Sequence, residues 1–140
     1  MSLDVDLIVD ETFTCECGKT SKTGSYSAYD ANITHNLGEM ATKAGIYEAL
    51  WRPYRLKENF NISKDNHEAE WKFEEENITL AKDIIPLLET GLSKLKKRRK
   101  YFEKFNSPNG WGIYEHFVPF VEKYLKACKE FPNSIIKVSR

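Results

Sequence analysis

The first residues of the chain alternate between apolar and polar side chains. The apolar positions are Leu3, Val5, Leu7 and Val9. A period of two places alternate side chains on opposite faces of a β-strand, so we predict a strand with one buried face. The turn-forming stretch 18–24 is followed by a second run over 25–29, which predicts the returning strand of a hairpin.

From residue 33 the period changes to that of a helix. Apolar residues recur at alternating steps of four and three, at Ile33, Leu37, Met40, Ala44, Tyr47 and Trp51. This spacing is typical of an amphipathic helix, and Asn32 is a suitable N-cap for it. We expect Gly45 to end or break the helix, and Pro53 to stop any continuation.

Two further helices are predicted in the second half of the chain. The first begins with Thr79 as its cap, ends in the basic run 94–100, and contains Pro86, which predicts a kink or a late start. The second follows a turn at 106–110. Its shared face carries Tyr114, Phe117, Val118, Val121, Leu125 and Cys128. The β-branched segment 135–139 then predicts a last strand that joins the N-terminal sheet.

These elements predict an α+β fold. It consists of a small antiparallel sheet, made of the N-terminal strands plus the C-terminal strand, packed with three main helices. With 140 residues the chain has the usual size of one domain, 1–140. We interpret the polar residues 54–76 as a divergent connection with a short strand around Trp71.

The charge of the chain bears on its partners. Lys plus Arg number 21 and Asp plus Glu number 21, so the formal net charge is zero. A nucleic-acid partner is therefore not expected, and we interpret the basic run 94–100 as a solvated helix end balanced by the acidic cluster 68–76. The sequence also shows neither a signal peptide nor a membrane-spanning segment. We therefore expect a cytoplasmic protein without a membrane partner.

The three cysteines are Cys15, Cys17 and Cys128. Because their number is odd and no secretion signal is evident, we expect reduced thiols. The alternation of the first strand favours Cys15 and Cys17 as buried core residues. Half of a zinc site is the alternative, but a second ligand pair is missing from the sequence, and a redox role is a further alternative. No metal and no cofactor is predicted.

Specific polar groups are concentrated in residues 29–36, where a strand is expected to meet a helix. Asn32, His35 and Asn36 offer amide and imidazole groups suited to a polar or anionic ligand. His35 and Glu39 are four residues apart, so the carboxylate would orient the imidazole. The alternative is helix capping with a surface His–Glu pair, and the sequence leaves both open.

Aromatic residues beside turns offer a second set of candidates. Trp51 and Arg52, and Trp111 within the segment 109–114, would provide a stacking platform and an anion partner for a flat ligand, or simple rim packing. If both segments fold beside Asn32, they form one pocket. The predicted ligand-binding residues are Asn32, His35, Asn36, Trp51, Arg52 and Trp111. No catalytic constellation is evident.

Several segments of the chain resemble a known group of proteins. Residues 29–41 (YDANITHNLGEMA), 44–53 (AGIYEALWRP) and 109–115 (NGWGIYE) are similar to a family of small uncharacterised proteins of phage and prophage genomes. The resemblance covers most of the chain except 54–76. It implies a bacterial host, and an accessory role such as binding a host protein or sequestering a nucleotide-derived signal.

Three functions are compatible with these observations. The leading hypothesis is a non-catalytic phage or prophage accessory protein that binds a small polar, nucleotide-like ligand. The first alternative is an interaction module that binds a host protein. The second is a small enzyme that uses His35 as an acid or base, although we do not favour catalysis. The free edges of a small sheet also permit a homodimer.

Overall fold

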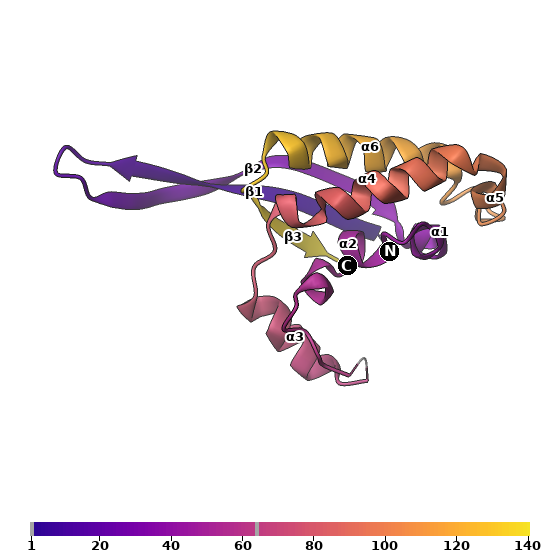
Figure 1. The fold of residues 1–140 in the computed structure, drawn as a ribbon, viewed down its shortest axis with the longest axis horizontal. Coiled ribbons are helices and arrows are strands. Elements are labelled where there is room, and N and C mark those ends of the chain that lie inside the picture. Colours follow the sequence, from indigo (N-terminus) through magenta and orange to yellow (C-terminus); the bar gives the residue numbers. More distant parts are fainter. Residues whose placement is uncertain (1, 64) are drawn as a thin grey trace.

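A computed structural model of the chain describes residues 2–63 and 65–140. Its strands are β1 (Ser2–Thr14), β2 (Thr20–Thr34) and β3 (Ile135–Ser139). The α-helices are α1 (Gly38–Ala44), α2 (Tyr47–Trp51), α3 (His67–Glu76), α4 (Ala81–Lys97), α5 (Arg99–Glu103) and α6 (Tyr114–Glu130), and the short 3-10 helices are η1 (His35–Leu37) and η2 (Pro53–Leu56). The predicted α+β fold is confirmed (Figure 1).

The sheet contains three antiparallel strands in the order β2-β1-β3. The C-terminal strand joins the N-terminal hairpin, as predicted, with Val5 opposite Val138 and Leu7 opposite Ile136. Because β1 is the central strand, its apolar side chains are the most protected of the sheet. Leu3, Val5 and Leu7 are fully buried, which confirms the period-of-two interpretation.

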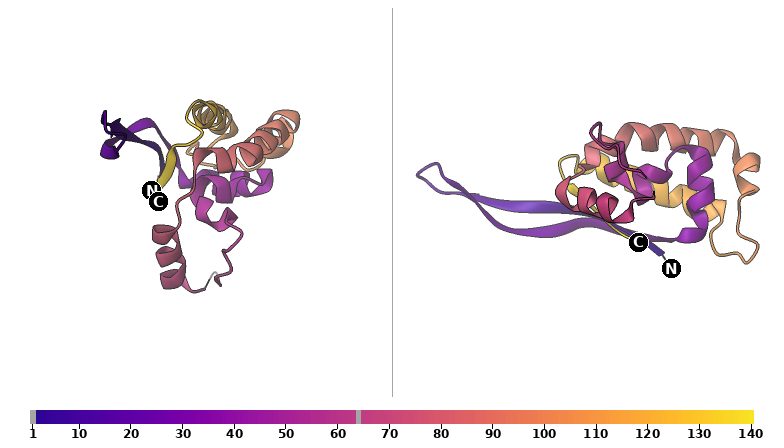
Figure 2. Two further views of the ribbon diagram at one scale, coloured as in Figure 1. Left: turned by 60° about the vertical axis from the view of Figure 1, so that its left-hand side comes forward. Right: turned by 90° about the horizontal axis from the view of Figure 1, so that it is seen from below.

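Helices cover one face of this sheet (Figure 2). α6 lies along β2, and α4 packs against α6. The largest side chains buried beneath them are Trp51, Tyr124, Phe102 and Phe117. The opposite face carries Asp4, Asp6 and Asp30, which are aligned across β1 and β2 and remain at least partly exposed.

The β1–β2 hairpin extends well beyond the rest of the molecule (Figure 1). β3 pairs with residues 4–8 of β1, so the hairpin continues past that point with only two strands. We call residues 11–24 the arm and the remainder the body. β2 already begins at Thr20, and the predicted return strand over 25–29 was therefore too short, because the turn is confined to the few residues between Thr14 and Thr20.

Two of the three cysteines, at the tip of the arm, differ from the prediction. Cys15 and Cys17 form a disulfide, so the expectation of reduced thiols buried in a strand is wrong for this pair. Cys17 is exposed and Cys15 is half-buried in the turn. Cys128 is a buried free thiol, as predicted, and burial raises its pKa to about 12.

The first helical segment begins later than predicted and is divided. β2 continues to Thr34, which pairs with Ser2, so Ile33 and Asn32 belong to the strand and Asn32 is not an N-cap. Thr34 has that role, because its hydroxyl accepts a hydrogen bond from the Asn36 N–H at 3.4 Å. Gly45 ends α1 in the left-handed conformation with φ 78°, as the sequence predicted.

The segment 54–76 contains a helix where a polar connection and a short strand around Trp71 were predicted. Asn66 caps α3 by accepting from the Ala69 N–H at 3.2 Å. The pattern misleads because α3 buries a charged residue, Glu70, while Trp71 is 61% exposed. In α4 the predicted cap Thr79 is also wrong: Asp83 accepts from the Leu80 N–H at 3.0 Å, and Pro86 lies inside the helix.

The charged clusters do not neutralise each other as predicted. In the basic run, Lys96 pairs with Glu122, and Arg99 pairs with Glu103 and Glu115. The acidic cluster is instead bound by arginines of other segments: Glu70 by Arg55, and Glu74 by Arg140.

The two edges of the sheet differ in how they are covered. The Ile136 N–H of β3 donates to the Thr79 carbonyl oxygen at 2.9 Å, and the Ala81 N–H donates to the Ser134 carbonyl oxygen at 2.9 Å. The connection before α4 therefore covers the outer edge of β3. Within residues 2–63 and 65–140, no strand pairs with the outer edge of β2. None of the helices in those ranges combines the length and apolar character needed to cross a bilayer.

Candidate functional site

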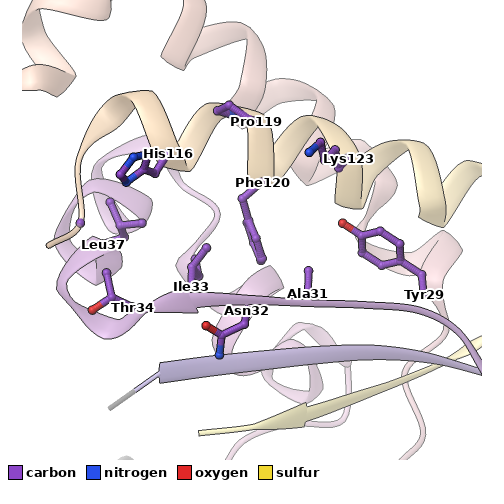
Figure 3. A pocket seen from close by; sticks show the side chains of 11 residues that line it. Tyr29, Ala31, Asn32, Ile33, Thr34, Leu37, His116, Pro119, Phe120 and Lys123 are labelled. Atoms are coloured by element: carbon purple, nitrogen blue, oxygen red, sulfur yellow. The ribbon is translucent and has the colours of Figure 1, made fainter.

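A groove of about 450 Å³ lies between β2 and α6. It runs beside the uncovered edge of β2, and Figure 3 shows it from close by. Residues from the strand, the helix and the loop before the helix form its walls. They are Tyr29, Ala31, Asn32, Ile33, Thr34, Leu37, Gly112, His116, Pro119, Phe120 and Lys123.

The strand wall follows from the alternation of β2. Tyr29, Ala31 and Ile33 project toward α6, whereas Asn32 points away (Figure 3). The Asn32 amide donates to the Asp4 carboxylate at 2.7 Å on the opposite side of the sheet. The small side chain of Ala31 leaves the middle of the groove open. One end is closed by Tyr29, whose ring stacks on Tyr124 at 6.1 Å.

The helix wall is one face of α6. Four residues of this face line the groove: His116, Pro119, Phe120 and Lys123. The last three follow His116 by three, four and seven positions, and this spacing aligns side chains on one side of a helix. Phe120 is buried and forms an apolar floor.

The polar groups of this wall are free. His116 and Lys123 are exposed, and among the described residues neither has an ion-pair partner. The acidic neighbours Glu115 and Glu122 are engaged elsewhere, by Arg99 and Lys96 respectively. The rim of the groove therefore offers the positive charge of Lys123 and the imidazole of His116 to a ligand.

A fixed loop with an exposed tryptophan forms the other end of the groove. Gly112 has φ 104°, and a Cβ there would lie 2.9 Å from Asn36 Cβ, so only glycine permits this approach. The Asn36 amide donates to the Trp111 carbonyl oxygen at 2.8 Å, and the Trp111 N–H donates to Asn109 Oδ1 at 2.9 Å. The Trp111 side chain is nevertheless 71% exposed.

The six predicted ligand-binding residues do not form one pocket. Asn32 is part of the groove lining. Asn36 and Trp111 lie beside its loop end, where they are joined by the hydrogen bond described above. The remaining three residues, His35, Trp51 and Arg52, lie in two other sets of contacts.

His35 is turned toward the core. The Trp51 indole N–H donates to His35 Nδ1 at 3.0 Å, and the Trp51 ring stacks on Tyr47 at 5.2 Å. The other imidazole nitrogen, Nε2, is buried and has no hydrogen-bond partner among the described residues. The predicted partner Glu39 is an exposed residue of α1, and the hydrogen bond that orients His35 comes from Trp51.

Arg52 belongs to a polar network that attaches α3 to the body. It donates to the Tyr54 hydroxyl at 2.8 Å, and that hydroxyl donates to Glu70 at 2.6 Å. Arg55 also binds Glu70. Although burial alone would raise the pKa of the Glu70 carboxyl, the hydrogen bonds from Arg55 and Tyr54 and the nearby arginine charges lower it. Burial and the hydrogen bond to Glu70 raise the pKa of Tyr54.

Sequence reasoning missed the helix wall of the groove. His116, Phe120 and Lys123 lie more than eighty residues from β2, so only packing brings them beside Ala31. The signal available in the sequence was weak: a histidine and a lysine seven residues apart, flanking a phenylalanine on one helix face.

The described residues contain no group of three or more side chains that could hold a metal ion. Comparison with protein-family models, curated proteins and solved structures finds no match for this chain. The groove between β2 and α6 is therefore the feature of this chain from which a function can be inferred.

Proposed function

We propose that this protein is a non-catalytic binding module that holds an extended segment of a partner protein between β2 and α6. The observation that carries the proposal is the open outer edge of β2 beside a preformed groove. An extended peptide adds to such an edge through main-chain hydrogen bonds, while its alternate side chains enter adjoining pockets. The edge of β3 is covered at Thr79 and Ala81, which leaves β2 as the edge for this interaction.

The chemistry of the groove defines the segment that would fit. Ala31 and Phe120 provide an apolar floor, which favours an apolar side chain at every second position of the peptide. Lys123 and His116 on the rim favour acidic residues, and their charge complementarity would fix the register. Trp111 is an exposed aromatic residue of the type that anchors interfaces, and its backbone is held by hydrogen bonds to Asn36 and Asn109. We therefore propose a partner segment that alternates apolar and acidic residues.

The resemblance to phage and prophage proteins supports a biological setting for this module. We propose a phage or prophage accessory protein in the cytoplasm of a bacterial host, with a host protein as the partner. The zero net charge argues against nucleic acid as the ligand of the groove.

A small polar ligand is the second candidate. The groove volume of about 450 Å³ lies within the usual range for small-molecule sites. Trp111 and His116 near one end offer stacking and hydrogen bonding to a flat, polar molecule. Asn36 and Trp111 lie beside this end and remain part of this hypothesis, whereas the Asn32 amide points away from the groove and binds Asp4.

We do not propose His35 as a catalytic acid or base. Its Nδ1 accepts from Trp51 and its Nε2 is buried, and His35 does not line the groove.

Peptides selected from a randomised library on the immobilised protein test the proposal. The affinity of the best peptide is measured by fluorescence anisotropy for the unmodified protein and for three variants. Ala31→Trp fills the groove and should abolish binding. Lys123→Glu should lower the affinity for an acidic peptide by about tenfold. Trp111→Ala should lower it by about the same factor or more.

Lys82→Glu is the matched control, because Lys82 is an exposed residue of α4 outside the groove. It should leave the affinity unchanged. Unchanged affinity in Ala31→Trp would contradict the proposal. Binding of free nucleotides but of no peptide, lost in Trp111→Ala, would favour the small-ligand candidate, and a shift to a dimer without either ligand would assign the edge to a second copy of the chain.

A further inference from the structure

The disulfide lies in the turn between β1 and β2, at the tip of the arm. Cys15 and Cys17 are two residues apart and lie at the far end of the hairpin, well clear of the helices (Figures 1 and 2). Cys17 is exposed, and Cys15 is partly accessible. The disulfide therefore lies at the surface, where a dissolved thiol can approach it.

The hairpin turn is closed without help from the disulfide. The Cys15 N–H donates to the Lys19 carbonyl oxygen at 2.9 Å, and the Gly18 N–H donates to the Cys15 carbonyl oxygen at 2.9 Å. The hydroxyls of Thr14 and Thr20 are also in hydrogen-bond contact at 3.1 Å across the strands. These contacts should persist when the sulfur–sulfur bond is broken.

The ring that the disulfide closes is also too small to restrict the unfolded chain much. The stabilisation from a cross-link grows with the length of the loop that it closes, and here only Glu16 lies between the two cysteines. A disulfide that adds little to folding and is exposed belongs to the labile, exchangeable class. The third cysteine, Cys128, is buried in the body and is not available as a competing thiol.

We propose that Cys15 and Cys17 form a redox site that exchanges its disulfide with a dithiol protein. A thiolate of the partner attacks Sγ of Cys17, the more exposed of the two residues. The bond between Cys17 and Cys15 breaks, and Cys15 leaves as a thiolate and takes up a proton. The second thiolate of the partner then attacks the partner sulfur that is bonded to Cys17 in the mixed disulfide. This step forms the partner's disulfide and releases Cys17 as a thiolate, which is also protonated.

The exchange is balanced and needs no further reactant. The partner loses two electrons and two protons and becomes a disulfide, and the tip gains both and becomes a dithiol. The site is independent of the groove between β2 and α6, because the arm lies at the opposite end of the hairpin (Figure 1).

The full chain is tested with a synthetic peptide that contains two cysteines, in the absence of air. We expect one peptide disulfide to form for each protein molecule, with Cys15 and Cys17 becoming alkylatable together and Cys128 remaining protected. Cys15→Ser and Cys17→Ser should form no peptide disulfide. Cys128→Ser is the control and should react like the unmodified protein.

Two further readouts distinguish an exchange site from a structural cross-link. A peptide with one cysteine should be trapped on Cys17, as located by mass spectrometry, and reduction should shift the Tm by no more than about 2 °C. A larger fall of the melting temperature on reduction would identify a structural cross-link and overturn the proposal. Failure of the dithiol peptide to reduce the tip would equally overturn the proposal.

Discussion

The β1–β2 hairpin passes through two environments, and they differ in what holds the strands. In the body, Leu3, Val5 and Leu7 are fully buried beneath helices and β1 has a neighbour on each side. In the arm, the described side chains are exposed or half-exposed, and each strand has one neighbour. An isolated two-stranded hairpin is marginally stable in water. The order of the arm therefore depends on the body, whereas the body does not depend on the arm.

The largest effect is expected from a cavity under the body half of the hairpin. Leu7→Ala removes a fully buried side chain and should lower the free energy of unfolding by about 3 kcal/mol. Thr14→Ala in the arm should change it by less than about 0.5 kcal/mol. Urea denaturation followed by circular dichroism compares the two, and similar losses would show that both halves support the fold equally.

A smaller loss is expected where a buried carboxylate binds α3 to the body. Glu70→Gln should lower the free energy of unfolding by about 2 kcal/mol, because Tyr54 and Arg55 lose the negative charge to which they donate hydrogen bonds. The pKa of Glu70 is lowered in the folded protein, so its contribution is present above the usual glutamate pKa and is lost as the pH falls through the folded pKa. Urea denaturation over a pH series should show that the free energy of unfolding falls at acid pH in the unmodified protein, and that it falls less in Glu70→Gln.

The arm provides the control for this substitution. Glu16 is an exposed carboxylate at the tip, so Glu16→Gln should leave both the stability and its pH dependence unchanged. An equal acid loss in Glu70→Gln and in the unmodified protein would contradict the assigned role of Glu70.

Two glycines give a third comparison. Gly45 ends α1 with φ 78°, and Gly45→Ala should cost about 1 kcal/mol because a Cβ disfavours this conformation. Gly24 in the arm has no positive φ and nothing within 4 Å of an added Cβ, so Gly24→Ala should be neutral. Thermal unfolding of both variants measures the difference, and a cost at Gly24 would mean that the arm is more constrained than its exposure indicates.

Removal of the arm should have the smallest effect on the body. Asp10 pairs with Ser25, so residues 11–24 can be replaced by Asn-Gly, which favours the tight turn of a two-residue hairpin. We expect the free energy of unfolding to change by less than about 1 kcal/mol. The shortened protein should also retain peptide binding in the groove. Loss of the cooperative transition would contradict the independence of the body.

Where local pattern decided the structure, the sequence was sufficient. The alternation through Leu3, Val5 and Leu7 and the buried face of α6 were each predicted from one residue period, and the strand at 135–139 was predicted from its β-branched residues. Ile33 was assigned to a helix because it fits both periods. Pairing of β2 with β1 as far as Thr34 decided the matter, and pairing partners are not visible in a single local pattern.

The missed features depend on which side chains meet in space, and the residue pattern does not show this. α3 lacks an apolar stripe because its buried residue, Glu70, is charged and satisfied by Arg55. Counting cysteines gave an odd number, but the count says nothing about a bond between two near neighbours. Half of the predicted ligand residues lie in or beside the groove, whereas His35, Trp51 and Arg52 face other partners.

The pairing of β3 with β1 has a consequence for the order in which the molecule is made. Asp4 lies opposite Ser139, so the central strand leaves the ribosome long before one of its two neighbours does. The β1–β2 hairpin can form while synthesis continues, but the other flank of β1 stays open until most of the chain has been translated. Long-range pairing of this kind is slow, and an open strand flank on a nascent chain can associate with other chains. Because of this topology, a chaperone would protect the open flank of β1 until β3 pairs with it.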